Sequence, residues 1–384
     1  MVEGWVDKLV SEIAPLQRGF DLPNSQIEQG DFPIVYSNGI GKNHKYAMAK
    51  GPGLVTGRSG TIGSLTFIES DYFPHNTTLW VTNFKGNNEK FIYYLYHQID
   101  WQRYSTGSGV PTLNRNDIHE LALSLPSDVN EQRRIAAALS DADAYISALE
   151  KLIAKKRNIK QGAMQELLTG KRRLPGFSGG WMEKRIGGIG KTYSGLIGKN
   201  KSHFGQGNAK YITFLNVLLN TVIDIDILEH ICVSENESQN IVKEYDLFFN
   251  TSSETPEEVG MCAVLTKPLT NTYLNSFCFG FRLTDGGIDG LFLSYFFNSF
   301  EGRKIMSLLA QGATRYNLSK AHFNDVILTL PDKPEQAAIA QILSDMDAEI
   351  DALAAKLNKA RDIKQGMMSE LLTGRIRLVE LSVN

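Results

Sequence analysis

The segment most suggestive of chemistry is Gly187-Gly188-Ile189-Gly190-Lys191-Thr192, which ends in the Gly-Lys-Thr of a phosphate-binding loop. Such a loop needs a glycine five residues before its last one, so that backbone N–H groups can surround a phosphate. That position holds Arg185, and no apolar strand leads into the segment. We therefore interpret the segment as a turn and not as a nucleotide site.

The other chemistry-bearing residues are scattered. Seven histidines lack metal-ligand spacing, and no Gly-x-Gly-x-x-Gly fingerprint or Asn/Asp-Pro-Pro-aromatic sequence of an amino-methyltransferase is present. The acidic run from Glu254 to Glu258 is typical of a solvated loop. We expect no catalytic residue, no metal site and no cofactor in this chain, which favours a binding function.

Composition favours an ordinary globular protein of two to three domains, because 384 residues exceed a usual single core. Three unpaired cysteines, Cys232, Cys262 and Cys278, indicate thiols in a reducing compartment. No apolar run approaches the ~18 residues that a membrane span needs, and no signal-peptide pattern opens the chain. We expect a cytoplasmic protein. The net charge of −2 means that any DNA contact must come from local patches.

One segment occurs twice, at a constant offset of 204 residues. The first copy runs from Glu131 to Leu174 and the second from Glu335 to Leu378, with about 26 of 44 positions identical and no gap. Both copies contain Ile-Lys-Gln-Gly followed by Leu-Leu-Thr-Gly. A dissimilar stretch precedes each copy. The repeat therefore predicts a duplicated protein with two different heads.

Both copies have the heptad pattern of a long helix, with apolar residues on two neighbouring stripes. Each follows a proline-marked loop, and Gly170 and Gly374 are placed to end the helices. Gly162 and Gly366 indicate a short kink or a close helix approach. The residues expected in the helix–helix seam are Ile135, Leu139, Ala142, Ile146, Leu149, Ile153, Ile339, Leu343, Met346, Ile350, Leu353 and Leu357.

A long helix with an exposed apolar stripe needs a partner, and its own copy is the nearest one. We expect an antiparallel coiled coil with a pseudo-twofold axis and one head at each end. The predicted fold class is α+β, with two mixed α/β heads separated by the two helices. The predicted boundaries are residues 1–125 for the first head, 126–174 for the first helical spacer, 175–330 for the second head and 331–384 for the second spacer.

The two heads share marks at their ends. Gly4-Trp5 and Gly180-Trp181 open them, and Gly107, Leu113 and Pro126 recur with identical spacing as Gly312, Leu318 and Pro331. Strands are predicted at residues 53–56, 62–68, 246–249 and 262–265. Helices are predicted at residues 91–103 and 291–309.

This combination resembles the specificity (S) subunit of type I restriction-modification systems. The resemblance is carried by the Glu-Gln helix entries, the Ile-Lys-Gln-Gly…Leu-Leu-Thr-Gly helix ends, and Lys171-Arg172-Arg173-Leu174-Pro175-Gly176-Phe177 leading into Trp181. In the heads it is carried by the turns 57–63 and 246–253 and by Gly107-Ser108-Gly109 and Gln311-Gly312-Ala313. One departure is Thr251-Ser252-Ser253, where the first head has Arg58-Ser59-Gly60.

The resemblance implies two target-recognition domains and two conserved helices. Each domain would read one half of a bipartite DNA sequence, and the helices would set the spacer. Two methyltransferase (M) subunits with S-adenosylmethionine would dock on the helices and heads, and restriction (R) subunits using ATP and Mg would join them. The assembled complex would be an N6-adenine DNA methyltransferase and an ATP-dependent site-specific deoxyribonuclease. The chain itself would be a non-catalytic subunit.

The candidate DNA-binding residues lie in loops rich in Gly, Ser and Asn, where readers of base edges usually sit. In the first head they are Lys42, Lys45, Arg58, Ser59, Thr61, Arg103, Ser108, Asn114 and Arg115. In the second head they are Lys199, Lys201, His203, Lys210, Ser252, Ser253, Arg315, Asn317 and Lys320.

Two other functions fit parts of this pattern. A two-headed coiled-coil scaffold without DNA specificity would explain the helices and the near-neutral charge, but not the strict spacing that precedes both helices. A hydrolase with a hidden site would need catalytic residues that no motif indicates. Retardation of a DNA duplex by the chain with its M subunit distinguishes the first reading from the scaffold.

Overall fold

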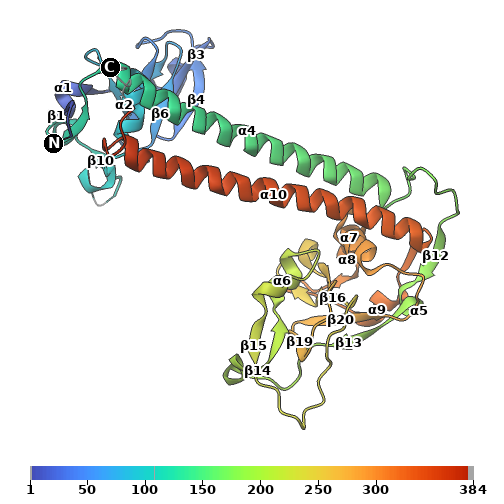
Figure 1. Ribbon diagram of the computed structural model, residues 1–384. Helices are drawn as coiled ribbons and strands as arrows, with labels where there is room; N and C mark the ends of the chain where they lie inside the picture. Colours follow the sequence, from blue (N-terminus) through green and yellow to red (C-terminus); the bar gives the residue numbers. More distant parts are fainter. Residues whose placement is uncertain (1, 108, 379–384) are drawn as a thin grey trace, which may run out of the picture. The chain divides into compact units, whose positions relative to one another are not determined.

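The computed structural model describes residues 2–107 and 109–378, and the chain divides into two compact units. The first unit comprises residues 1–151 and 355–384, and the second comprises residues 152–354. Each unit therefore contains one head together with part of both long helices, α4 (Val129–Leu167) and α10 (Lys333–Leu371) (Figure 1).

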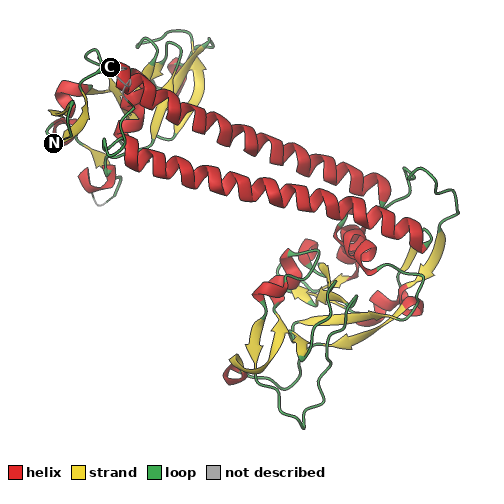
Figure 2. Cartoon of the chain, in the orientation of Figure 1, coloured by secondary structure: helices red, strands yellow, loops and turns green. Residues whose placement is uncertain are grey.

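The head of the first unit is built from small sheets, antiparallel except for the parallel pair β3–β7, and short helices (Figure 2). Its sheets have the strand orders β1-β11, β2-β8-β5-β6, β4-β3-β7 and β9-β10. Its elements are β1 (Trp5–Leu9), α1 (Val10–Ile13), β2 (Leu16–Arg18), β3 (Phe32–Tyr36), β4 (Gly39–His44), β5 (Gly53–Gly57), β6 (Leu65–Ile68), β7 (Phe73–Pro74), β8 (Thr78–Val81), α2 (Glu89–Tyr96), β9 (Ser105–Thr106), β10 (Thr112–Leu113), α3 (Arg115–His119) and β11 (Ala122–Pro126).

The head of the second unit has the same kind of architecture, with one parallel pair, β14–β19, and one long strand, β14, of nine residues. Its sheets have the orders β12-β23, β13-β20-β16-β18, β15-β14-β19 and β17-β22-β21. Its elements are β12 (Met182–Arg185), α5 (Ile186–Ile189), β13 (Gly190–Ser194), β14 (Phe204–Ile212), α6 (Phe214–Leu219), β15 (Glu229–Ile231), β16 (Leu247–Asn250), β17 (Ser252–Ser253), β18 (Cys262–Val264), β19 (Thr272–Leu274), β20 (Cys278–Leu283), α7 (Gly290–Asn298), α8 (Phe300–Leu309), β21 (Ala310–Gln311), β22 (Tyr316–Leu318), α9 (Lys320–Asp325) and β23 (Ile327–Leu330).

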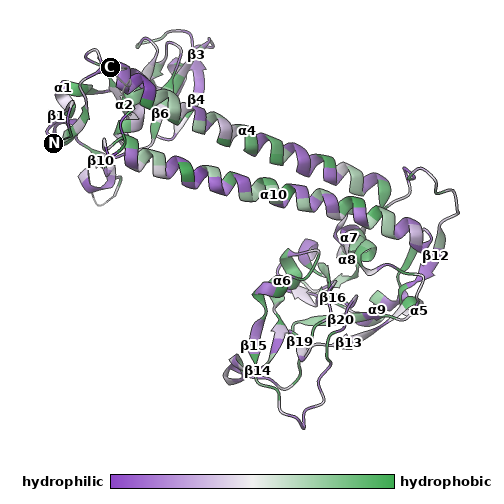
Figure 3. Ribbon diagram, in the orientation of Figure 1, coloured by the Kyte–Doolittle hydropathy of each residue, from purple (hydrophilic) through white to green (hydrophobic). Residues whose placement is uncertain are grey.

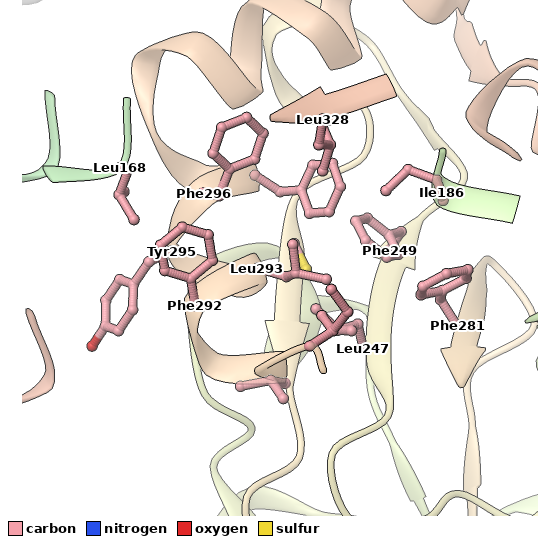
Figure 4. Close-up of a cluster of buried hydrophobic side chains, with 14 of the residues drawn as sticks. Leu168, Ile186, Leu247, Phe249, Phe281, Phe292, Leu293, Tyr295, Phe296 and Leu328 are labelled. Atoms are coloured by element: carbon pink, nitrogen blue, oxygen red, sulfur yellow. The ribbon is translucent and has the colours of Figure 1, made fainter. Parts of the chain in front are cut away.

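The main core of each unit joins the head to both long helices. In the second unit, aromatic residues of β16, β20 and α7 pack with Leu168 and with Ile339 and Leu343 of α10 (Figure 4). In the first unit, α2 and the strand β8 pack with Ile135 and Leu139 of α4 and with the end of α10. Burying these apolar faces is the dominant stabilising contribution, and neither head has this core without its helices.

The long helices pair antiparallel in both units. In the first unit, ion pairs link Glu150 to Arg361 and Asp143 to Lys364, each at 2.6 Å. In the second unit, Lys156 contacts Glu349 at 2.6 Å and Lys160 pairs with Asp347. Hydrophobic and hydrophilic residues alternate along both helices (Figure 3). The ion pairs agree with the expected antiparallel pairing of the two copies, which the heptad pattern alone does not specify.

The predicted seam residues differ in their surroundings. Ile135 and Leu139 belong to the core of the first head, and Ile339 and Leu343 belong to that of the second. The first turns of each long helix therefore serve a head. The buried members are Ile135, Leu139, Leu149, Ile153, Ile339, Leu343, Ile350 and Leu357, and the half-buried members are Ala142, Ile146, Met346 and Leu353.

The predicted helix ends are confirmed. Gly170 and Gly374 have φ angles of 70° and 73°, a left-handed conformation that favours glycine. Trp181 packs on Gly170 and Trp5 packs on Gly374, so a Cβ at either glycine would lie 3.3 or 2.9 Å from an indole carbon. The tryptophan that opens each head therefore fastens it to a helix end.

Several local predictions need correction. α4 and α10 run unbroken through Gly162 and Gly366. Within residues 2–107 and 109–378, no atom other than those of the chain neighbours and the helix's own backbone lies within 4 Å of a Cβ built at either glycine, so the expected close helix approach is wrong. The helix predicted from residue 91 ends at Tyr96. The helix predicted from residue 291 is split, because Ser299 ends α7 and its Oγ accepts a hydrogen bond from the Gly302 N–H in α8.

Most of the predicted strands are confirmed at β5, β16 and β18, but the strand predicted from residue 62 begins only at Leu65. The Gly-Lys-Thr segment is not a turn. It forms the short helix α5 followed by strand β13, whereas a phosphate-binding loop requires a strand followed by a helix.

Candidate nucleic-acid interface

A glutamine at the start of each long helix fixes the helix to its head. In the first unit the Gln132 Oε1 accepts from the Asn88 N–H, and its Nε2 donates to the Pro126 carbonyl, both at 2.9 Å. Asn88 in turn caps α2 by accepting from the Phe91 N–H at 2.9 Å. Gln132 is buried, so these bonds satisfy polar atoms that would be costly to leave unpaired.

The second unit repeats this arrangement. The Gln336 Oε1 accepts from the Asp289 N–H at 2.9 Å, and its Nε2 donates to the Pro331 carbonyl at 2.8 Å. Asp289 caps α7 by accepting from the Phe292 N–H at 2.8 Å. The recurring Gln therefore has one function in both copies, which is to set the start of the helix against the first turn of a head helix.

A buried glutamate beside each glutamine accepts a two-pronged bond from an arginine. Glu131 receives the Arg377 guanidinium at 2.6 and 2.7 Å, and Glu335 receives that of Arg173 at 2.6 Å to both oxygens. Both carboxylates are at most 1% exposed. The hydrogen bonds raise the pKa of both arginines. Each pair ties the segment after one long helix to the start of the other.

A tyrosine, an aspartate and a lysine form a second matched contact in each unit. The Tyr94 hydroxyl donates to Asp143 at 2.7 Å, and Lys364 pairs with the same carboxylate at 2.6 Å. In the second unit the Tyr295 hydroxyl donates to Asp347 at 2.8 Å, and Lys160 pairs with that carboxylate. Burial is the main cause of the raised pKa of both tyrosines. Each trio joins the head helix to both long helices.

Sequence reasoning named the Glu-Gln entries but missed their partners. The signal was present, because Arg173, Lys160 and Asp143 recur at the same offset of 204 residues as Arg377, Lys364 and Asp347. Polar residues that recur within an otherwise diverging repeat indicate a shared contact. Their partners could not be read from spacing, because the pairs lie far apart in the chain.

In the first head, backbone hydrogen bonds gather several predicted readers at one turn. The Arg58 N–H donates to the Thr77 carbonyl, and the Leu113 N–H donates to the Arg58 carbonyl, both at 2.8 Å. Gly57 opens the turn, where a Cβ would lie 1.7 Å from the Thr61 carbonyl oxygen. The residues brought together are Arg58, Ser59, Thr61, Asn114 and Arg115.

The other candidates of the first head lie apart from this turn or beside it. Lys42 is exposed on β4, and Lys45 follows that strand and pairs with Glu28 at 3.2 Å. Arg103 is exposed in a short 3-10 helix, next to Gln102, whose side chain donates to the Ile62 carbonyl at 3.3 Å. Ser108 lies outside the described residues.

In the second head, the predicted readers at the matching turn lie on paired strands. Ser252 pairs with Asn317 and Ser253 with Tyr316. The Arg315 Nη2 donates to the Ser252 Oγ at 3.3 Å. Lys320 lies beside this sheet and donates to the Ser194 Oγ at 3.2 Å. Ser252 is only 5% exposed, so its hydroxyl serves the turn as an acceptor for Arg315.

The remaining candidates of the second head belong to a different sheet or to the loop before it. Lys201 and Lys210 are exposed, and the His203 Nδ1 accepts from the Asn200 N–H at 3.2 Å. The Lys199 side chain is 2% exposed, contacts Glu237 at 2.5 Å and donates to a backbone carbonyl. Lys199 was predicted as a DNA-binding residue, and its ammonium group here joins Glu237 to the Cys232 carbonyl.

Other site types find little support. Among residues 2–107 and 109–378, no group of three or more His, Cys, Asp or Glu side chains is arranged to hold a metal ion. No helix in the same ranges is long and apolar enough to cross a membrane. The Gly-Lys-Thr segment borders an open cavity of about 650 Å³, where Arg185 is already paired with Asp325.

Two mixed α/β heads, each packed on a repeated helix, define a class of two-headed proteins. The sequence model of the type I restriction modification DNA specificity domain matches residues 2–161 and 178–361. The chain therefore belongs to this family, and it contains two such segments, one for each head. The family and fold class predicted from the sequence are thereby confirmed.

Individual relatives agree. A putative type I restriction enzyme MjaX specificity subunit from Methanocaldococcus jannaschii is 23% identical over 281 residues, which cover 70% of this chain and 62% of that protein. A putative type I specificity subunit from Mycoplasma pneumoniae is 25% identical over 174 residues, which cover 43% of this chain and 46% of that protein. The chain thus spans less than two thirds of these relatives.

Solved structures share the fold. The S subunit of a type I restriction-modification system from M. genitalium has a TM-score of 0.64 at 15% identity, with 96% of each chain covered. A chain from a study of complex assembly and conformational transition in the type I R-M system has a TM-score of 0.58 at 14% identity, covering 97% of this chain and 98% of that one.

Proposed function

We propose that this chain is the DNA sequence-specificity subunit of a type I restriction-modification complex. The observation that carries the proposal is that three polar contacts of the long helices recur in both units. They are the buried glutamine at the start of each helix, the buried Glu–Arg pair and the Tyr–Asp–Lys trio, and each occurs in both units with corresponding partners. These three contacts are alike in the two units, whereas the surfaces of the two heads differ. This is expected if the two heads read two different half-sites.

In this proposal each head reads one half of a bipartite double-stranded DNA sequence, and the helix pair sets the spacer. Phosphate contacts place a head on the duplex, whereas side chains at base edges provide sequence preference. The exposed arginines and lysines at the head turns supply local positive charge, which a chain of net charge −2 lacks overall.

The chemistry of such a complex belongs to its partners. Two M subunits supply S-adenosylmethionine and the adenine pocket, and R subunits supply ATP-driven cleavage with Mg. This chain supplies no catalytic residue and holds the M subunits at opposite strands through its internal repeat. Two observations support docking of two M subunits: the chain belongs to this family, and the matched contacts of the long helices give each M subunit an equivalent helix surface.

The test is retardation of a labelled duplex library by the purified chain with its M subunit, with and without S-adenosylmethionine. Enrichment of one bipartite sequence supports the proposal. Equal binding of all duplexes, or binding of none while the protein complex forms, would favour the two-headed scaffold.

A further inference from the structure

The hairpin that precedes the last helix of each head has the same register in both heads. In the first head Leu113 faces Ser105, and in the second head Leu318 faces Ala310. Both pairs are separated by the same offset of 205 residues. Gly107 and Gly312, at the same offset, both have positive φ angles of 105° and 137°. Positions 105–107 and 109–113 therefore correspond to positions 310–312 and 314–318.

The strand that faces this hairpin corresponds as well. The Leu113 N–H donates to the Arg58 carbonyl at 2.8 Å, and the Leu318 N–H donates to the Thr251 carbonyl at 2.8 Å. One residue further, Ser59 bridges to Thr112 as Ser252 pairs with Asn317. Arg58 of the first head therefore occupies the backbone position of Thr251 in the second.

This correspondence shows that the two heads carry an arginine on different strands of the same small sheet. The first head has Arg58 on the turn strand and Val110 in the hairpin. The second head has Thr251 on the turn strand and Arg315 at the hairpin position that matches Val110. The Arg315 guanidinium reaches back across the sheet to the Ser252 Oγ, beside Thr251. At this pair of positions each head thus has one guanidinium, supplied by the turn strand in the first head and by the hairpin in the second.

Arg58 is half-buried and Arg315 is exposed, so both side chains retain a surface that a ligand can contact. Among the described residues, neither Arg58 nor Arg315 forms an ion pair with a carboxylate, unlike Lys45 and Lys199. The hairpin position is open, because Val110 is 65% exposed and Arg315 is exposed. A guanidinium has a planar fork of donors, which matches the O6 and N7 acceptors of guanine in the major groove.

We propose that Arg58 and Arg315 are matching specificity-determining residues, each reading a guanine edge in the half-site of its own head. This inference rests on the proposed DNA-specificity function. A guanidinium could instead contact a phosphate, and removing the arginine would then have a different effect on DNA binding. Loss of a base contact relaxes preference at one position, whereas loss of a phosphate contact weakens binding to all sequences alike.

The experiment uses the complete chain with its M subunit and compares Arg315→Ala with the exchange variant Thr251→Arg/Arg315→Val. Competition binding uses duplexes altered at single positions of either half-site. Arg315→Ala should lower affinity for the intact site by about tenfold or more and relax preference within one half-site only. The exchange variant, which copies the first head, should restore binding to within about threefold.

The reciprocal variants, Arg58→Ala and Arg58→Thr/Val110→Arg, should show the same loss and recovery for the other half-site. Lys304→Ala in α8 is the matched control, because it removes an exposed cation of the second head that is not among the candidate DNA-binding residues. Arg315→Lys keeps the charge without the fork and should retain affinity better than preference.

The proposal is overturned if an exchange variant binds no better than the corresponding alanine variant. Equal weakening on every duplex would also overturn it, since that result assigns a phosphate contact. These outcomes are distinct from failure of the proposed function, because that failure would appear with the unaltered chain as binding without any bipartite preference.

Discussion

At the scale of residues, the structure separates charges that hold the protein together from charges that face outward. Glu131 and Glu335 are buried with arginine partners, whereas Arg58 and Arg315 have no carboxylate partner among the described residues. Burial of a carboxylate is tolerable only with complete hydrogen bonding. Charge alone in the sequence could not distinguish these roles.

Replacing Arg377 by Ala should destabilise the first unit by roughly 3 kcal/mol, because it leaves the Glu131 carboxylate buried without its partner. Glu131→Gln should cost less, since the amide oxygen still accepts from the guanidinium. Urea unfolding of the full chain measures both. Equal and negligible losses for the two variants would show that the pair contributes little.

Acidification should weaken the first unit through His119. Burial and then the nearby Arg115 charge lower the pKa of this imidazole below its usual 6.5. The neutral ring is therefore favoured in the folded state, and the unfolded state binds more protons at mildly acidic pH. The stability associated with neutral His119 is present above pH 6.5 and is lost as the pH falls below it.

The urea midpoint measured from pH 8 to pH 5 should fall less steeply for His119→Gln than for the unaltered chain. Glutamine can still accept the hydrogen bond that the His119 Nε2 receives from the Leu16 N–H at 2.9 Å. Parallel pH profiles for both proteins would exclude His119 as the titrating group.

At the scale of elements, two chemically similar glycines in each long helix have different functions. Gly170 adopts a positive φ beneath Trp181, whereas Gly162 is a helix-interior residue with open space around it. The sequence alone assigns both to the repeat. Only the backbone angle and the neighbouring indole show which of them the fold requires.

Gly170→Ala should destabilise the second unit by about 1–2 kcal/mol, because a Cβ is unfavourable at positive φ and meets the indole. Gly162→Ala should instead stabilise by up to about 1 kcal/mol, since alanine favours the helix interior. Thermal unfolding of both variants gives the comparison. Effects of the same sign would contradict the distinction.

Sequence reasoning predicted the elements whose signals are local. The heptads, the Gly170 and Gly374 terminators and the antiparallel pairing follow from residues near one another or from the repeat itself. The break at Ser299 was missed, because a serine inside an apolar run signals a new helix cap only once the backbone has turned. The sequence also does not predict that Arg58 and Arg315 occupy one site from different strands, because this depends on hydrogen bonds between segments more than 50 residues apart.

At the scale of the whole molecule, duplication explains why one chain presents two recognition heads. The core of each unit and its Tyr–Asp–Lys trio combine a head with parts of both long helices, so neither half of the repeat is complete without the other. The helices are therefore shared structure, and the heads are free to diverge on the surfaces that face a ligand.

Inserting four residues between Lys151 and Leu152 and four between Ala354 and Ala355 should lengthen the preferred spacer. Each insertion adds ~6 Å of helix, which is less than two base-pair steps of ~3.4 Å. The half-sites should stay unchanged, because the contacts between the heads and the long helices lie outside the inserted segments. Methylation assays on duplexes of varied spacer length measure the effect. An unchanged spacer with altered half-sites would reject a measuring role for the helices.

The most direct test of the account is a map of methylated adenines in the genome of cells that contain this chain and its M subunit. The account predicts one bipartite motif with a fixed unspecific spacer, and Arg58→Ala should relax one half of it while the other half persists. A single uninterrupted motif, or relaxation of both halves by that one change, would contradict the assignment of one half-site to each head.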